Sequence, residues 1–255
     1  MNQKGKRMSH GSNETLSIGW CDNGMVDGKF AEGIMYTTIT APTRKLAVNN
    51  AIRVQGNQIG RQRQALLDMW YDQVKTDWLL WVDSDIVLTL DVLEMLWKLA
   101  DKNTKPVVSG VYFISKQMES SLMQPMPALF NETGEEFSIR YIHPLPASEI
   151  IKVDCAGLGL TLMHRSVVPK LRALSPDYSV FAEQENIGDK FVGEDIVFFR
   201  NLKKAGVDVY AHTGARVKHM KRFAYDDNYY ALYWQAAQAA ERQAKEQADG
   251  NTTAE

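Results

Sequence analysis

Cysteine is scarce in this 255-residue sequence, which contains only Cys21 and Cys155. Two cysteines cannot build a disulfide framework or a cysteine-based zinc site, and they suit a reducing compartment, so we expect two structural thiols. Apolar runs are short as well, and none approaches the ~20 residues of a membrane span. The polar residues 1–15 lack the apolar core of a secretory signal. These absences predict a cytoplasmic protein without a transmembrane segment.

The sequence also lacks a large excess of either positive or negative charge. The formal net charge is −2, from 29 basic and 31 acidic residues, so the whole surface does not favour nucleic acid or membrane as a partner. Hydrophobic residues make up 45% of the chain and charged residues 24%, which is typical of soluble globular proteins. Any electrostatic site must therefore be local.

Two polar ends flank one predicted domain. Residues 1–15 and 245–255 have little to bury, and we predict that both are disordered. Between them, in residues 16–244, short apolar runs alternate with helical patterns. This alternation predicts a single α/β domain with a mostly parallel central sheet flanked by helices, ending in a carboxyl-terminal helix.

The hydrophobic periodicity places the main elements. We expect strands at residues 34–40, 78–82, 107–113, 150–153, 158–163 and 207–210. Helices are expected at residues 59–74, 167–174, 194–205 and 227–245, and after a cap near Thr89. Residues 117–146 are proline-containing and of mixed polarity, and we interpret them as a surface excursion that carries an acceptor-binding element.

The strongest local signal is an apolar run, residues 78–82, that ends in Asp83-Ser84-Asp85. Side chains alternate with period two along a strand, so both carboxylates can point the same way, about 6–7 Å apart. Anions at the end of a buried strand must be exposed or neutralised, and a divalent cation neutralises two at once. The alternative, with Asp83 as a cap and Asp85 as a solvated loop residue, stays open on the motif alone.

Four ordered segments resemble the GT-A glycosyltransferases, especially family 2. Residues 60–67 with 77–85 resemble the helix and metal-binding strand of that family's first half. Residues 154–165 resemble its glycine-containing segment near the donor sugar, residues 193–199 its acidic motif at a helix start, and residues 217–220 the strand whose histidine completes the metal site. The resemblance covers about residues 34–222. Residues 40–44 only partly replace the family's first nucleotide-binding motif.

The resemblance implies a GT-A (Rossmann-like) fold and a metal-dependent transfer of sugar from a nucleotide-sugar donor, a UDP-sugar, to an acceptor hydroxyl. It implies a metal site of Asp83, Asp85 and His219, in which Asp85 is the direct carboxylate ligand and Asp83 reaches the ribose or, through water, the metal. An imidazole among the ligands favours Mn²⁺ over Mg²⁺. His212 competes for the ligand role, and we interpret it as structural. The predicted nucleotide-sugar-binding residues are Thr40, Pro42, Arg44, Arg61, Asp83, Ser84, Gly157, Gly159, Lys218 and Lys221.

Inverting transfer needs a carboxylate base on the acceptor, and a helix amino terminus is a suitable place to hold an anion. We predict that Asp195 is this base and that Glu194 is the alternative. The acceptor is not defined by the sequence: a glycan, a protein, a lipid carrier, a small molecule or a modified nucleobase all fit.

Two other functions fit parts of the pattern. A strand ending in Asp-x-Asp also opens the haloacid-dehalogenase phosphatases, but their motif lies near the chain start and is followed by a Gly-Asp-x-x-x-Asp pair that is absent here. A GT-A-like domain that binds nucleotide sugar or glycan without turnover is the non-enzymatic alternative. Intact Asp83, Asp85, Asp195 and His219 favour the enzyme.

Overall fold

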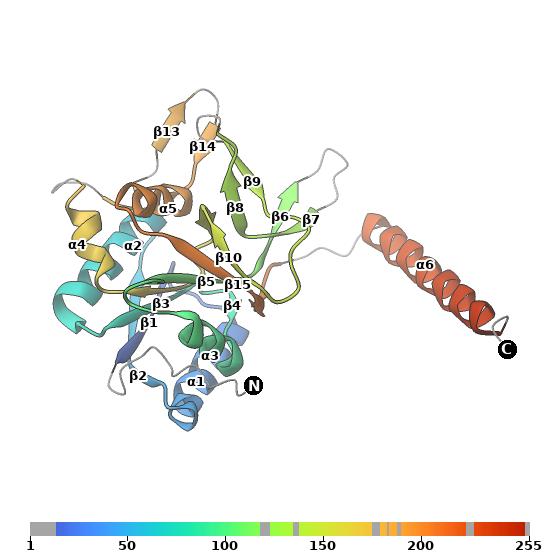
Figure 1. The fold of residues 1–255 in the computed structure, drawn as a ribbon, viewed down its shortest axis with the longest axis horizontal. Coiled ribbons are helices and arrows are strands. Elements are labelled where there is room, and N and C mark those ends of the chain that lie inside the picture. The colour runs from blue at the N-terminus through green and yellow to red at the C-terminus, as the bar shows by residue number, and fades with distance from the viewer. Residues whose placement is uncertain are drawn as a thin grey trace, which may run out of the picture. The chain divides into compact units, whose positions relative to one another are not determined.

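The computed structural model in Figure 1 describes residues 14–117, 123–134, 138–174, 179–182, 184–187, 190–222 and 227–252. The chain comprises two units. The first unit is Met1–Lys116 with Pro125–Met220, and it contains the central sheet and the helices that cover it. The second unit is Gln117–Gln124 with Lys221–Glu255, and its main element is the helix α6 (Asp227–Thr252).

A seven-stranded sheet in the order β10-β15-β5-β12-β3-β1-β2 forms the centre of the first unit. The pairings make β1, β2, β3, β5 and β15 run in one direction, and only β10 and β12 run against them. The mostly parallel α/β sheet expected from the sequence is thus confirmed. Its strands are β1 (Thr15–Asp22), β2 (Ala47–Gln55), β3 (Trp78–Val82), β5 (Val107–Val111), β10 (Ile150–Val153), β12 (Leu160–His164) and β15 (Val209–Arg216).

Helices cover both faces of this sheet, because its central strands are apolar on both sides. In β3, Leu79 and Trp81 join one core cluster while Leu80 joins the other. The first cluster takes residues from α2 (Ile59–Asp68), its π-helical continuation (Met69–Val74), α4 (Val167–Arg172) and α5 (Glu194–Lys204). The second takes residues from α1 (Gly28–Thr40) and α3 (Leu90–Leu99).

Several smaller sheets of two or three short strands accompany the central sheet. The pair that bears on the site is β4 (Ile86–Val87) with β16 (Lys218–His219), which run antiparallel. A three-stranded sheet contains β8 (Leu129–Glu132), β9 (Ile139–Tyr141) and β11 (Cys155–Ala156). The remaining pairs are β6 (Phe113–Gln117) with β7 (Met123–Pro127), and β13 (Gln184–Ile187) with β14 (Lys190–Val192).

Several predicted elements are confirmed. Strands β3 and β10 have the expected bounds. The helix α3 begins after Thr89, whose hydroxyl accepts a hydrogen bond from the Val92 amide at 3.4 Å. The helix α5 ends at Lys204, before Gly206 in the left-handed region at φ +68°. Cys21 and Cys155 are both buried free thiols.

The strand predicted at residues 34–40 is wrong, because this segment is the second half of the helix α1. Phe30, Ile34, Thr37 and Ala41 are all buried, and their spacing of three and four residues is that of a helix face. Asp27 caps this helix by accepting from the Lys29 amide at 2.8 Å. The β-branched residues 37–40 favoured a strand locally, and packing on the sheet overrides that preference.

The first strand was not predicted at its true position. β1 begins at Thr15, the last residue of the segment predicted to be disordered, and residues 1–13 lie outside the described residues. At the other end α6 continues to Thr252, past the boundary predicted at residue 245, and residues 253–255 are again not described. Within the described ranges, no helix combines the length and apolarity that a membrane crossing requires.

Candidate functional site

The Asp83-Ser84-Asp85 segment is a turn at the carboxyl end of β3, where parallel α/β sheets bind their ligands. The Asp83 amide donates to the Gly159 carbonyl at 3.2 Å, and the Asp83 carbonyl accepts from the Ile86 amide at 2.9 Å. Because the backbone turns here, the period-two alternation of a strand does not apply. The two carboxylates, predicted to point the same way, instead meet different partners.

Asp83 faces Arg63 of α2. The Arg63 side chain is 5% exposed, and its Nη2 donates to Asp83 Oδ1 at 3.0 Å. Its Nη1 donates to Glu194 Oε1 at 2.8 Å and also forms an ion pair with Asp195. Burial opposes the arginine's charge, but Asp83 and Glu194 more than compensate, so the pKa of Arg63 is raised. The buried Arg63 guanidinium thus connects Asp83 with Glu194 and Asp195, the two candidate bases.

Asp195 lies in the first turn of α5, the position predicted for the base. Its second carboxylate oxygen accepts from the Leu158 amide at 3.2 Å, which ties it to the glycine-containing segment as well as to Arg63. The Asp195 side chain is 26% exposed and that of Glu194 is 15% exposed. Asp195 is therefore the more accessible of the two carboxylates.

The two glycines of that segment allow close approaches within the protein. A Cβ at Gly157 would lie 2.0 Å from the Tyr112 hydroxyl oxygen, and a Cβ at Gly159 would lie 2.4 Å from Asp83 Oδ2. Burial, reinforced by the nearby Asp83, raises the pKa of Tyr112, so its hydroxyl stays protonated. These glycines make room for Tyr112 and Asp83, which is the packing alternative to direct contact with a sugar.

Asp85 faces His219, which the pairing of β4 with β16 brings to it. His219 Nε2 lies 3.2 Å from Asp85 Oδ2, and His219 Nδ1 lies 2.8 Å from the Phe113 carbonyl oxygen. A carbonyl can only accept, so it fixes the proton on Nδ1 and leaves a lone pair on Nε2 in the neutral ring. In that form of the ring, an imidazole nitrogen and a carboxylate oxygen lie side by side, and both are common metal ligands.

The residues therefore fit a metal with two protein ligands rather than three. Asp85 and His219 converge, whereas Asp83 is directed to Arg63, and the described residues hold no group of three His, Cys, Asp or Glu side chains arranged to bind one ion. Divalent ions that act on phosphates are commonly held by one or two protein groups, with substrate oxygens completing the shell. The pair Asp85 and His219 suits that arrangement.

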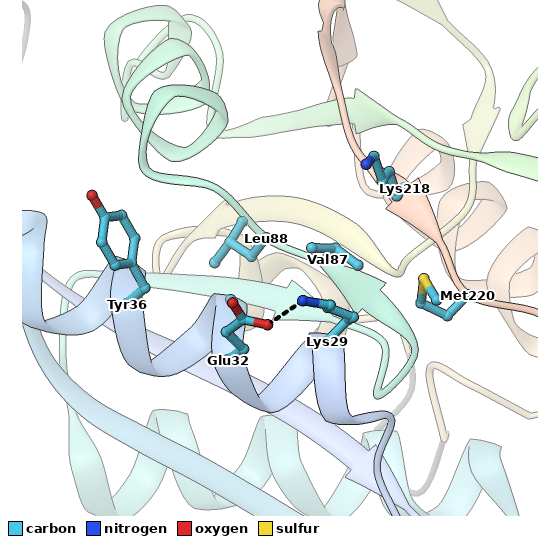
Figure 2. A pocket seen from close by; sticks show the side chains of 8 residues that line it. Lys29, Glu32, Tyr36, Val87, Leu88, Lys218 and Met220 are labelled. Carbon is cyan, nitrogen blue, oxygen red and sulfur yellow. Dashed lines mark hydrogen bonds and ion pairs between the residues drawn. The ribbon is translucent and has the colours of Figure 1, made fainter.

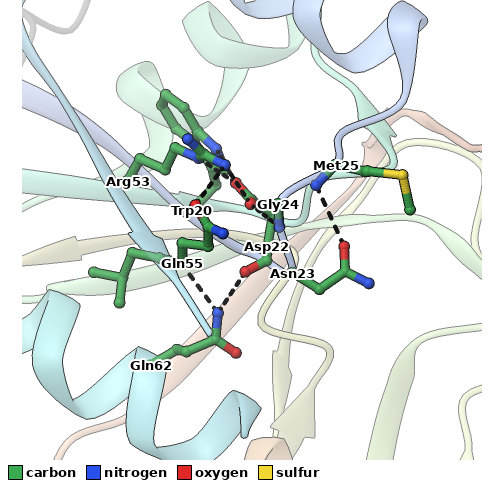
Figure 3. A network of polar contacts seen from close by, with 9 residues as sticks. Trp20, Asp22, Asn23, Gly24, Met25, Arg53, Gln55 and Gln62 are labelled. Carbon is green, nitrogen blue, oxygen red and sulfur yellow. Dashed lines mark hydrogen bonds and ion pairs between the residues drawn. The ribbon is translucent and has the colours of Figure 1, made fainter. Parts of the chain in front are cut away.

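Beside this turn, the carboxyl ends of β1 and β2 carry a polar network, drawn in Figure 3. Arg53 binds Asp22 through two donors at 2.6 and 2.7 Å, and this contact lowers the pKa of Asp22 although burial opposes the shift. Gln62 donates to the Asp22 carbonyl at 2.8 Å. A hollow of about 340 Å³ lies here, lined by Cys21, Asp22, Asn23, Gly56, Asn57, Ile59 and Gln62.

This hollow is close to the buried arginine. Gln62 precedes Arg63 on α2, and Arg63 and Asp83 are among the charges that act on the Cys21 thiol, whose pKa is raised to about 12 chiefly by burial. A concave polar site and the Asp83 turn therefore share one edge of the sheet.

The structure does not bring Thr40, Pro42 and Arg44 to this edge. They lie at the end of α1 and in the following 3₁₀ turn (Ala41–Arg44), ahead of the first residue of β2 and thus at the amino ends of the parallel strands. Arg44 pairs there with Asp91, at 3.1 Å, and with Glu94 of α3. These residues were assigned to the nucleotide on the premise of a strand at 34–40, which is wrong.

The other predicted site residues have surroundings of their own. Arg61 is exposed on α2, and Ser84 contributes its carbonyl to the Asp27 amide at 3.0 Å. Lys218 is exposed and lines a different hollow of about 420 Å³, with Lys29, Glu32 and Tyr36 among its other residues (Figure 2). Lys221 is exposed and belongs to the second unit. His212 accepts from the Gly214 amide at 3.1 Å.

Sequence reasoning missed the residue that organises the site. Arg63 precedes Leu66, Leu67 and Trp70 by three, four and seven residues, so it lies on the buried face of α2, whereas Arg61 does not. That spacing was available in the sequence and distinguishes the two arginines. Tyr112 left no comparable signal, because a tyrosine after an apolar strand is common in cores.

No family model matches the sequence, and no curated protein matches it. Solved structures with a similar fold include A197 from STIV, with TM-score 0.48 and 17% identity over 82% of this chain and 86% of that chain. They also include GalNAc-T7 with UDP, GalNAc and Mn²⁺, with TM-score 0.45 and 11% identity over 82% of this chain. This chain spans only 44% of that protein.

A third similar structure is a glycosyltransferase involved in the glycosylation of the major capsid of PBCV-1, with TM-score 0.42 and 11% identity. The similarity covers 82% of this chain and 94% of that chain. At these identities the similarity concerns the fold alone.

Proposed function

We propose that this chain is a divalent-metal-dependent glycosyltransferase that moves a sugar from a nucleoside diphosphate sugar to an acceptor hydroxyl. The observation that carries the proposal is the pair Asp85 and His219. His219 Nδ1 lies 2.8 Å from the Phe113 carbonyl oxygen, and its Nε2 lies 3.2 Å from the Asp85 carboxylate. This arrangement is a ready half-shell for a metal ion such as Mn²⁺.

The remaining half of the shell would come from the donor diphosphate. The ion would act as a Lewis acid on the leaving diphosphate and fix its position. We place the nucleoside in the 340 Å³ hollow lined by Cys21, Asp22 and Gln62, because this hollow lies at the same edge of the sheet as the Asp83 turn. Asp83 would then support the site through Arg63 and would not ligate the ion directly.

On the acceptor side, Asp195 is the proposed base and Glu194 its alternative. Asp195 is fixed by the Leu158 amide and by Arg63, yet its side chain keeps 26% exposure, so a hydroxyl can reach it. Glu194 shares the same guanidinium at lower exposure.

The test is donor binding with and without metal. Titration calorimetry of UDP and several UDP-sugars with wild-type protein in Mn²⁺ should give binding that excess EDTA abolishes. Asp85→Asn should weaken binding in Mn²⁺ to the level seen in EDTA, because it removes one of the two protein ligands while keeping the side-chain shape. Asp72→Asn, at an exposed aspartate that pairs with Arg172, is the matched control and should bind as wild type does.

Undiminished donor binding in EDTA would contradict the metal role. A different result would support the non-catalytic alternative: the protein binds donors in a metal-dependent way but neither hydrolyses them nor transfers their sugar. A phosphatase is disfavoured by the contact of Asp83 with Arg63, because that contact occupies the carboxylate that would have to attack phosphorus.

A further inference from the structure

Tyr112 lies between His219 and the glycine-containing segment at residues 157–159. It joins β5 to β6 and is 4% exposed. Its ring meets the His219 imidazole edge to face, with centroids 5.0 Å apart and planes at 79°. Its hydroxyl oxygen would lie 2.0 Å from a Cβ at Gly157, and it lies 3.4 Å from the Gly159 amide nitrogen. One buried side chain therefore contacts both parts of the candidate site.

The main chain fixes the gap that the Tyr112 side chain fills. The Ala128 amide donates to the Tyr112 carbonyl at 2.9 Å, and the Ala128 carbonyl accepts from the Gly157 amide at 2.8 Å. Because both segments are bonded to the same residue, they cannot separate without breaking a main-chain hydrogen bond. A change in the size of the tyrosine side chain must therefore move one of its neighbours or leave a gap.

On the metal side, Tyr112 gives the His219 ring a further contact. The hydrogen bond from Nδ1 to the Phe113 carbonyl sets the tautomer, but an imidazole can still tilt about a single hydrogen bond. The edge-to-face contact of two aromatic rings has a preferred geometry, so it restricts this tilt. The tilt decides where Nε2 points, and in the structure Nε2 lies 3.2 Å from the Asp85 carboxylate.

On the acceptor side, the segment beside the Tyr112 hydroxyl is hydrogen-bonded to two carboxylate residues of the site. The Leu158 amide donates to Asp195 Oδ2 at 3.2 Å, and the Gly159 carbonyl accepts from the Asp83 amide at 3.2 Å. A shift of this segment would move the proposed base and the turn after β3 together. Misplacing a reacting group by about 1 Å can cost about 100-fold in rate.

We propose that Tyr112 is a positioning residue, which orients the His219 imidazole for the metal ion and holds Asp195 at a fixed distance from that ion. The roles of His219 and Asp195 are those of the proposed function, on which this inference rests. Tyr112 touches neither the ion nor the sugar. It acts through its ring on the metal side and through its hydroxyl on the acceptor side, so two substitutions of this residue should have different effects.

The first experiment separates the ring from the hydroxyl. Tyr112→Phe keeps the ring on His219 and removes the hydroxyl, so kcat for donor turnover should fall about 10-fold while Mn²⁺ affinity stays within about 2-fold of wild type. Tyr112→Leu removes both, so Mn²⁺ affinity of the donor-loaded protein should fall about 10-fold as well. Tyr210→Phe, at a half-buried tyrosine near the start of β15, is the matched control and should match wild type in both.

The second experiment tests the contact between Tyr112 and Gly157. Gly157→Ala puts a methyl group where the tyrosine hydroxyl lies, so Tyr112 must move and kcat should fall about as far as in Tyr112→Leu. In the double variant, Gly157→Ala with Tyr112→Leu, the shorter leucine leaves room for the methyl group. Its kcat should therefore be no lower than that of Tyr112→Leu alone, whereas two independent losses would multiply.

The third experiment does not depend on activity. The sequence contains five histidines, so the His219 imidazole can be assigned in proton–nitrogen NMR spectra from its absence in His219→Gln. At alkaline pH, where the ring is neutral, metal-free wild type and Tyr112→Phe should show the Nδ1–H tautomer alone. Tyr112→Leu should show a mixture of both tautomers, because the imidazole can then turn away from the Phe113 carbonyl.

Three outcomes would overturn the proposal. One is a set of folded Tyr112 variants that lose stability but keep the kcat and Mn²⁺ affinity of wild type, as expected of a residue that only fills the core. Another is an unchanged His219 tautomer in Tyr112→Leu. The third is a double variant in which the losses of kcat multiply.

Circular dichroism checks that each variant is folded. If Tyr112→Leu does not fold, the kcat values of Tyr112→Phe and Gly157→Ala decide the question, and values equal to wild type overturn the proposal. Failure of the proposed function is distinct from these results, because wild type itself would then show no metal-dependent donor binding. In that case the His219 tautomers alone decide whether Tyr112 orients the imidazole.

Discussion

Asp83 and Asp85 lie two residues apart and have opposite surroundings. Asp83 points to a buried guanidinium, that of Arg63, and packs its carboxylate against the Gly159 backbone. Asp85 points to His219, whose Nδ1 donates a hydrogen bond to the main-chain carbonyl of Phe113. The first carboxylate is therefore paired with a buried guanidinium, and the second lies beside an imidazole nitrogen.

We propose that this difference separates structural from ligand-binding charge within one motif. Arg63 also binds Glu194 and Asp195, so the inward side of the turn is a network of three anions around one cation. In this network the protein itself supplies both the positive and the negative charges. On the outward side Asp85 and His219 converge, and we propose that the metal binds there. Five variants test this division, in order of expected effect.

The largest effect is expected for Asp195→Asn, on the inward side. The change keeps the shape and the hydrogen bond from Leu158 but cannot take a proton, so turnover should fall by ~10²–10⁴-fold, while donor affinity changes little. The measurement is kcat from donor turnover in Mn²⁺, with water as acceptor where no other is known. Glu194→Gln is the matched control and should retain most activity. A loss confined to Glu194→Gln would move the base to that residue.

Arg63→Met should cost the most stability. It removes the guanidinium that Asp83, Glu194 and Asp195 share and leaves three neighbouring carboxylates, which we expect to lower the free energy of unfolding by about 3 kcal/mol. The urea midpoint measures this. Arg61→Met, two residues away and exposed, is the control and should stay within about 0.5 kcal/mol of wild type. Equal effects of the two variants would show that the network does not stabilise the fold.

His219→Gln removes the imidazole ligand of the proposed metal site on the outward side. Loss of the imidazole should weaken Mn²⁺ binding to the donor-loaded protein by about 10–100-fold, with little change in stability. Calorimetric titration of Mn²⁺ gives the affinity. His212→Gln tests the other histidine of this region and keeps an acceptor for the Gly214 amide, so its Mn²⁺ affinity should match wild type. A reversed result would make His212 the ligand.

Gly159→Ala tests whether Asp83 and Asp85 have separate roles, because it crowds only Asp83. The added methyl would lie 2.4 Å from Asp83 Oδ2, so Asp83 must shift while Asp85 is untouched. Such overpacking typically costs about 1–3 kcal/mol. Thermal unfolding should show this loss, with Mn²⁺ affinity nearly unchanged. A large loss of metal affinity would instead make Asp83 a ligand.

The smallest effect concerns Asp22, next to the site on β1. Its pKa is lowered by Arg53, so the ionised form is favoured in the folded state. The resulting stability is present above the unfolded pKa, near 3.8, and is lost as pH falls through the folded value. The stability difference between wild type and Arg53→Gln should therefore be constant from pH 5 to 7 and shrink below pH 4. A difference that grows in acid would contradict the assignment.

The sequence by itself determined much of the scaffold. Residues 78–82 are apolar without alternation, which only a strand covered on both faces accommodates, and β3 has those bounds. The caps at Thr89 and Gly206 marked helix ends through local backbone chemistry. Where periodicity and propensity disagreed, as at residues 34–40, local preference favoured a strand and the packing of Phe30 and Ile34 made a helix.

The composition of the site was only partly contained in the sequence. The Asp83-Ser84-Asp85 motif, the carboxylates of α5 and His219 were found as separate signals. Which of them touch was decided by the tertiary structure, because contact depends on the turn after β3, on the pairing of β16 with β4, and on α2 bringing Arg63 across the sheet's edge. Spacing along a chain fixes which residues share an element. Only packing between elements fixes which charges are already paired inside the protein and which are left for a ligand.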